Sequence, residues 1–475
     1  MNITKITAKL RQSLASPRAR FYAFCSFVAL VFLTGGSSRD DIQSLVILRP
    51  LSVLFAAYAL SVADYSSWKG RLFPVYLILA LVALMILQLV PLPPSVWAQF
   101  PGRKIFADIA DLAGMAQPWR PLTLSPSRTV NSLMSLFVPL ASVFLYLNLP
   151  THMRKRAIIV IIIMISLSVL LAIAQITGPA RSSLYLYRIT NYGSAVGFFA
   201  NRNHQAVLLA MLILLLGWYA GSTNKSKESA SFKIFAAFGG VVAVIPLVLV
   251  TGSRAGLILS VAAIPIAFWL FSSPDNVTKT VRTHPRSGRF VSRRNLTIVL
   301  SVTGILAVAS MSLLFSRSLA LDRLFADGDI TELRSELLPI LISMAREYFP
   351  FGIGFGAFQH VYPIHEPLDL LAPAYLNRAH NDWLEFVIEA GLPGLFILVF
   401  AIGWISRRTI IILRDWKTLS NDRYVAILSL CSLLFVAAGS VGDYPARVPS
   451  IMLVCAIMLA IFADCSRKAP APDPD

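Results

Sequence analysis

Apolar residues gather along this chain into about a dozen long runs, most of 15 to 23 residues, separated by short polar connections. A helix needs roughly 20 apolar residues to cross about 30 Å of hydrocarbon, so each run is long enough to span a membrane. The pattern therefore predicts twelve membrane-spanning helices. The predicted spans are 21–34, 44–63, 73–90, 129–147, 157–176, 205–220, 234–250, 257–271, 296–315, 383–405, 424–439 and 450–463.

The composition agrees with an all-α polytopic membrane protein. Apolar residues make up 56% of the chain and charged residues 14%, against roughly half and a quarter in soluble domains. This balance argues against a single soluble core. We expect five regions: N-terminal spans and a first outer loop (1–128), central spans (129–316), a large periplasmic loop (317–382), C-terminal spans (383–464) and a disordered cytoplasmic tail (465–475).

Basic residues predict the orientation, because cytoplasmic connections are rich in Lys and Arg. With twelve spans, both termini and five connections share one side, which carries 26 basic and 8 acidic residues, and 16 of each remain elsewhere. We therefore expect both termini in the cytoplasm. The net charge of +18 is then an insertion signal rather than a sign of nucleic-acid binding. The basic cytoplasmic connections could contact anionic membrane lipids.

Two long segments, 91–128 and 317–382, fall on the opposite side, and long loops in compact proteins are usually functional. The first is rich in proline and tryptophan, which suggests that it lies along the membrane interface. The second is expected to form a helix over 330–348, then a glycine run over 350–356 and an irregular stretch.

A polar tetrad, Asn201-Arg202-Asn203-His204, opens the sixth predicted span on the outer side. Helix N-termini present free N–H groups and a partial positive charge, so an anion could bind here with the help of Arg202. The alternative is a helix cap with an arginine that reaches the interface.

A second polar motif, Thr-Gly-Ser253-Arg254-Ala-Gly, interrupts an apolar stretch of 38 residues. That stretch would make about 57 Å of helix, nearly twice the bilayer core, so the motif must be a tight turn between two spans. A guanidinium there favours a phosphate or carboxylate partner. The alternative for Arg254 is an internal salt bridge.

A third motif surrounds His380, which is a candidate proton acceptor because imidazole titrates near neutral pH. Three carboxylates that follow it, Asp382, Glu385 and Glu389, would share one face of a helix. The alternative is a histidine that caps a loop. A fourth candidate, Arg334 in the large loop, could instead belong to an internal ion pair.

Together these motifs resemble the superfamily of O-antigen ligases and O-antigen polymerases, which are bacterial membrane glycosyltransferases. The hallmark is His-Asn, nine residues, Gly, two residues and Gly, found here as His380-Asn381 and Gly391 to Gly394. The other motifs occur in the order of the family's further signatures, over residues from about 130 to 405.

The resemblance implies a C-type glycosyltransferase architecture and a donor glycan on undecaprenyl diphosphate. Transfer would be metal-independent, without a cofactor, inverting at the anomeric carbon, and would occur at the periplasmic face. We expect the diphosphate to be bound by arginines, and His380 to accept the proton of the acceptor hydroxyl. The expected diphosphate ligands are Arg202, Arg254, Arg334 and Arg378. The expected supporting residues are Asn201, His204, Ser253, Asn381, Asp382 and Glu385, of which the last two could orient the His380 ring.

The acceptor defines the alternatives within the superfamily. A ligase uses lipid A-core or a similar acceptor, a polymerase uses another lipid-linked repeat unit, and a related branch glycosylates protein. The motifs are common to these branches, and among them we favour a ligase. A polysaccharide transporter or flippase is the alternative from another class, but transporters hold charged groups near the bilayer midplane, and the predicted spans here are almost free of charge there.

Overall fold

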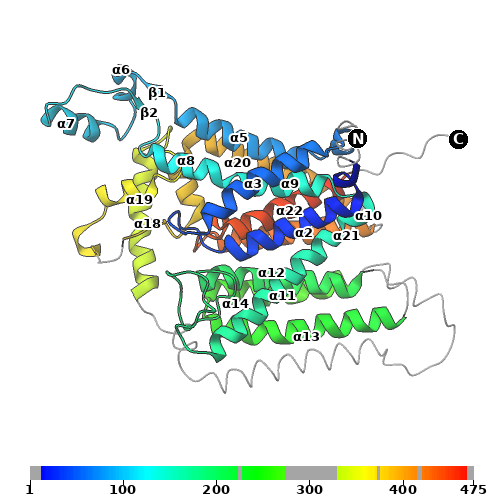
Figure 1. Ribbon diagram of the computed structural model, residues 1–475. Helices are drawn as coiled ribbons and strands as arrows, with labels where there is room; N and C mark the ends of the chain where they lie inside the picture. The colour runs from blue at the N-terminus through cyan, green and yellow to red at the C-terminus, as the bar shows by residue number, and fades with distance from the viewer. Residues whose placement is uncertain (1–11, 223–226, 273–328, 372–374, 415–419, 468–475) are drawn as a thin grey trace, which may run out of the picture.

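The computed structural model of the 475-residue chain describes residues 12–222, 227–272, 329–371, 375–414 and 420–467. Within this part the chain is mostly helical, and the long helices run roughly parallel in one bundle (Figure 1). These helices are α2 (Pro17–Thr34), α3 (Leu45–Ser61), α5 (Phe73–Gln88), α8 (Pro126–Ser135), α9 (Phe137–Leu147), α11 (Arg156–Thr177), α12 (Arg202–Gly221), α13 (Lys227–Thr251), α14 (Arg254–Phe271), α20 (Asp382–Arg414), α21 (Asn421–Gly439) and α22 (Pro449–Cys465).

One further long helix, α18 (Asp329–Glu347), lies in the second long segment. The short elements are α4 (Tyr65–Trp68), β1 (Pro91–Leu92), α6 (Pro94–Trp97), α7 (Lys104–Leu112), β2 (Arg120–Pro121), α10 (Thr151–Arg154), α19 (Phe358–Val361) and the 3-10 turns η1 (Tyr362–Ile364), η2 (Leu368–Leu370) and η4 (Pro445–Arg447). Helix α18 confirms the helix that the sequence predicted in the second long segment.

The predicted spans agree well with the helices. Among the described residues, eight helical segments are long and apolar enough to cross a membrane, and three shorter apolar helices, α3, α5 and α22, coincide with further predicted spans. The remaining predicted span, 296–315, lies outside the described residues. The chain is thus an all-α, multi-pass membrane protein, whereas the total of twelve spans stays a prediction.

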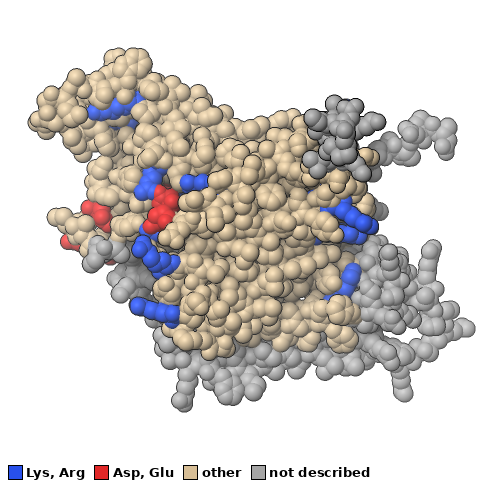
Figure 2. Space-filling model, in the orientation of Figure 1, with Lys and Arg blue, Asp and Glu red and all other residues tan. Residues whose placement is uncertain are grey.

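The two ends of the bundle differ in what they carry. At one end Asp464 contacts Arg71 at 2.7 Å and Arg154 of α10 at 3.2 Å, so two predicted cytoplasmic connections meet the C-terminal end of α22. The long segments that contain α7, α18 and α19 lie at the opposite end (Figure 1). Figure 2 shows charged side chains gathered toward both ends, with a broad uncharged band between them.

Helix α12 lies inside the bundle, and most of its residues are buried. It is apolar on nearly all sides, as expected for a helix surrounded by others. Small residues let α14 approach it closely, since a Cβ on Gly217 would lie 2.5 Å from the carbonyl oxygen of Ala267. A Cβ on Gly256 would likewise overlap Ala206. The first residues of α12 and α14 are therefore held at the same end of the bundle.

Helix α20 is broken at Gly391, where φ is 58°. The glycine run packs into this break: Ile353 N donates to Ile388 O at 2.9 Å, and Leu392 N donates to Pro350 O at 2.7 Å. A Cβ on Gly391 would overlap Pro350 O. The glycine of the hallmark thus serves a close backbone approach and a left-handed conformation that other residues seldom adopt.

The first long segment forms a projecting hairpin in which β1 pairs with β2 (Figure 1). Arg103 anchors it, because its buried Nη2 donates to Leu122 O and Gly352 O, both at 2.8 Å. Its guanidinium lies 5.8 Å from the Trp97 ring and 5.7 Å from the Tyr348 ring. Burial lowers the pKa of Arg103 to about 10. Hairpin and glycine run are therefore fastened together.

Candidate functional site

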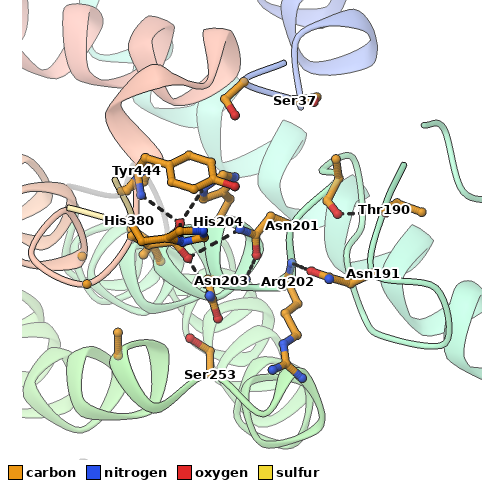
Figure 3. A pocket seen from close by; sticks show the side chains of 18 of the residues that line it. Ser37, Thr190, Asn191, Asn201, Arg202, Asn203, His204, Ser253, His380 and Tyr444 are labelled. Atoms are coloured by element: carbon orange, nitrogen blue, oxygen red, sulfur yellow. Dashed lines mark hydrogen bonds and ion pairs between the residues drawn. The ribbon is translucent and has the colours of Figure 1, made fainter. Parts of the chain in front are cut away.

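One cavity of about 610 Å³ opens at the end of the bundle that carries the long segments. Its walls come from six stretches that are far apart in the sequence: 37–39, 189–191, 200–207, 252–255, 377–380 and 439–445. Arg202, Arg254 and His380, predicted from three separate motifs, all line this cavity. Figure 3 shows Arg202 and Ser253 on one side of His380 and Ser37 on the other.

The start of α12 is capped by protein side chains. Asn201 Oδ1 accepts a hydrogen bond from Asn203 N at 2.9 Å, and Asn191 Oδ1 accepts one from Arg202 N at 3.0 Å. These two amides are already satisfied, so the cap alternative holds for the backbone here. An anion at this helix start would therefore depend on the Arg202 side chain, which reaches into the cavity (Figure 3).

The start of α14 has a similar construction. Ser253 is the N-cap, and its Oγ accepts a hydrogen bond from Gly256 N at 3.2 Å. The next residue, Arg254, is exposed at the cavity. Because α12 and α14 pack along their lengths, their first residues present two guanidinium groups to one space. These two arginines make this side of the cavity suited to a diphosphate.

His380 has an unusual backbone conformation, with φ at 51°. Left-handed conformations are uncommon outside glycine and cluster at functional sites, where surrounding contacts hold them. The ring packs edge-on against Tyr444 at 4.9 Å between centroids. Its Nδ1 lies 3.9 Å from Asp443 Oδ1. The histidine is thus held at the cavity wall beside a carboxylate.

Asp443 joins two histidines. Its Oδ1 also lies 3.4 Å from Nε2 of the buried His204, and its Oδ2 accepts a hydrogen bond from Asn203 Nδ2 at 2.5 Å. Burial alone would raise the pKa of Asp443, but the contacts with His204, His380 and Asn203 hold it well below its usual range. Asp443 therefore stays ionised and favours a positive charge on a neighbouring imidazole.

The carboxylates after His380 do share one helix face, as predicted, but their partner is Arg447. Arg447 lies 3.2 Å from Asp382, 3.2 Å from Glu385 and 2.9 Å from Glu389. The expectation that Asp382 or Glu385 orients the His380 ring needs revision, because the carboxylate beside that ring is Asp443. Among the described residues no cluster of His, Cys, Asp and Glu has the geometry of a metal site.

The other predicted site residues have different positions. Arg378 contacts Glu385 at 3.1 Å and donates to Ser38 O at 3.3 Å, and it lies outside the described lining of the cavity. Asn381 Oδ1 accepts a hydrogen bond from Leu384 N at 3.1 Å, as a helix cap does. The Arg334 side chain lies outside the described residues.

Asp443 and Arg447 were missed from the sequence. They lie between α21 and α22, in a connection of only nine residues, 440–448. An aspartate and an arginine in so short an outer connection are a signal in themselves, because each charge next to a span needs a partner or solvent. The predicted span boundaries place both on the outer side.

Comparison with known proteins supports the resemblance. Residues 239–399 match the family described as O-antigen ligase. The match runs from within α13 to within α20, so it contains Arg254, the glycine run and His380. It covers roughly a third of the chain, and Arg202 and the 440–448 connection lie outside it. A comparison with curated proteins finds no match.

Proposed function

We propose that this multi-pass membrane protein, which belongs to the O-antigen ligase family through residues 239–399, is an O-antigen ligase. It would transfer a polysaccharide from undecaprenyl diphosphate to lipid A-core or a similar acceptor. Members of this family are glycosyltransferase-like enzymes that act on lipid-linked glycans. One observation supports the proposal most directly: the arginines Arg202 and Arg254 and the His380–Asp443 pair share one cavity.

The chemistry requires a charged leaving group to be stabilised. The acceptor oxygen attacks the anomeric carbon while the bond from that carbon to the diphosphate oxygen breaks, and the bonding electrons remain on the diphosphate. Fixed positive groups lower the barrier when they bind the charge more strongly in the transition state. Arg202 and Arg254 would provide these groups without a metal, and a single displacement would invert the anomeric carbon.

The acceptor hydroxyl must lose its proton in the same step. His380 would accept that proton, since a neutral imidazole is a base near neutral pH. Asp443 would then stabilise the imidazolium that forms and would keep its Nδ1 side fixed, as a carboxylate does in other His–Asp pairs. His204, on the other side of Asp443, would support the same carboxylate.

The products that accumulate without the protein test this function. In a strain that lacks the gene, loss of a ligase is expected to leave long polymer on the lipid carrier, while surface lipid A-core stays unmodified. Loss of a polymerase would instead leave single repeat units on the carrier, and would favour the alternative within the family. Mass spectrometry of extracted glycolipids distinguishes these results. An unchanged glycolipid profile would contradict both.

We also propose that the cavity faces the periplasm and that both termini are cytoplasmic, on the strength of the predicted charge distribution. A cysteine introduced at Leu112 of α7, which is 89% exposed, should then react with a membrane-impermeant maleimide in intact cells. A cysteine at Lys69, an exposed residue in the predicted cytoplasmic connection between α3 and α5, should react only after the membrane is permeabilised. The four native cysteines would first be replaced with serine or alanine. The reverse labelling pattern would refute this orientation.

A further inference from the structure

The connection 440–448 wraps around the start of α20. Asp382 N donates to Ser440 O at 3.0 Å and to Asp443 O at 3.3 Å. Asp382 Oδ2 accepts hydrogen bonds from Ser440 Oγ and Ala446 N, both at 3.0 Å. This connection therefore fixes Asp443 relative to α20, whose first residue follows His380 by only two positions.

Arg447, in the same connection, balances a buried group of carboxylates. Glu385 and Glu389 are fully buried, and the Arg447 side chain, which is 17% exposed, contacts both of them and Asp382. Arg378 contacts Glu385 as well. Removing one partner from such a cluster leaves an uncompensated buried charge, which is strongly unfavourable. Arg447 thus supplies the positive charge that offsets these carboxylates and the contacts that hold them in place.

A continuous set of contacts leads from Arg447 to His380. Glu385 Oε1 contacts Arg447, and Glu385 Oε2 accepts a hydrogen bond from Ala379 N at 2.8 Å. Ala379 precedes His380, whose φ of 51° must be held by its surroundings. Glu389 extends the same set to the glycine run, because its Oε1 accepts a hydrogen bond from Gly356 N at 2.8 Å.

We infer that Arg447 is a positioning residue, which holds His380 and Asp443 in register through Glu385 and Asp382. Arg447 lies outside the described lining of the cavity, so it acts through other residues and does not bind the substrate. The inference rests on the proposed function, in which His380 accepts the proton. Its consequence is that Arg447 governs the rate of transfer and not the affinity for the lipid-linked donor.

The test compares Arg447→Lys with Arg154→Lys in purified, reconstituted protein. Arg154 is also a buried arginine paired with a carboxylate, Asp464 at 3.2 Å, but it lies at the opposite end of the bundle. Lysine keeps the charge and loses the planar fork, so both variants should lose similar stability. We expect kcat to fall about 10- to 100-fold in Arg447→Lys and less than twofold in Arg154→Lys, since misplacement by about 1 Å can cost that much.

Binding of undecaprenyl diphosphate separates positioning from general damage. Arg447→Lys should bind this lipid as the wild type does, while Arg254→Ala should bind it weakly. A wild-type kcat in Arg447→Lys would overturn the inference, and so would parallel losses of kcat, lipid binding and melting temperature. Absence of transfer by the wild-type protein would instead overturn the proposed function and the inference with it.

A second variant covers the case in which Arg447→Lys does not fold. The double substitution Arg447→Met with Glu389→Gln removes one positive and one negative charge, so the formal charge of the cluster is unchanged. Glu385, which links this cluster to Ala379, then keeps its contact with Arg378 but loses the Arg447 guanidinium. We expect normal membrane levels with the same loss of kcat. Wild-type kcat in this double variant would overturn the positioning role.

Discussion

Replacing Arg254 with alanine is expected to slow glycan transfer by about 100- to 1000-fold, the loss typical of removing one group that stabilises developing charge. Arg254 begins α14 and lines the same cavity as His380. Arg202→Ala should act in the same direction. The initial rate of transfer from a purified lipid-linked glycan, in protein reconstituted into liposomes, measures the effect.

Two controls make this result specific to the position of the charge. Arg181 is an exposed arginine at the same end of the molecule, outside the described lining of the cavity, so Arg181→Ala should retain the wild-type rate. Arg254→Lys should be intermediate, because lysine keeps the charge but cannot bind two phosphate oxygens in a planar fork. Full activity of Arg254→Ala at normal membrane levels would remove Arg254 from the mechanism.

His380→Ala should reduce the rate by about 100- to 10,000-fold, the range that general base catalysis contributes. The change should leave the affinity for undecaprenyl diphosphate intact, because the arginines bind that group. The rate and the lipid affinity are measured on the same preparation. Wild-type transfer by His380→Ala would remove His380 from the mechanism and leave deprotonation to the substrate itself.

The pH dependence of Asp443→Asn tests the His380–Asp443 pair. An ionised Asp443 favours the protonated imidazole, so its loss should move the acid limb of the rate profile to lower pH. The contacts that lower the pKa of Asp443 in the folded protein also stabilise the fold. This stabilisation is fully present above the pKa of an unfolded aspartate, about 3.9. It is lost only as the pH falls through the lowered value. An unshifted acid limb in Asp443→Asn would separate Asp443 from the proton transfer.

The spans could be read from the sequence because length and apolarity alone determine whether a helix can cross a bilayer. The helix starts were readable for a similar reason. Asn201 and Ser253 precede apolar runs, and both prove to be N-caps. Each of these features depends on neighbours along the chain.

The partners of the charged residues were not readable, because they come from distant segments. A helical repeat places Asp382, Glu385 and Glu389 on one face but does not say what lies opposite. The structure puts Arg447 there, which is 65 positions after Asp382. The expectation of free N–H groups at the start of α12 was wrong at Arg202 for the same reason. Its N–H donates a hydrogen bond to Asn191, which comes from the preceding loop.

The break at Gly391 gives the two parts of α20 different mechanical roles. The part before the break, residues 382–390, is tied by Arg447 and the glycine run into the assembly of outer loops. The part after it turns Phe396, Val399 and Phe400 outward, each at least 64% exposed, as a membrane anchor would. The break at Gly391 thus separates the segment that follows His380 from the segment that faces the lipid. A displacement of the lipid-facing segment would reach His380 only through this break.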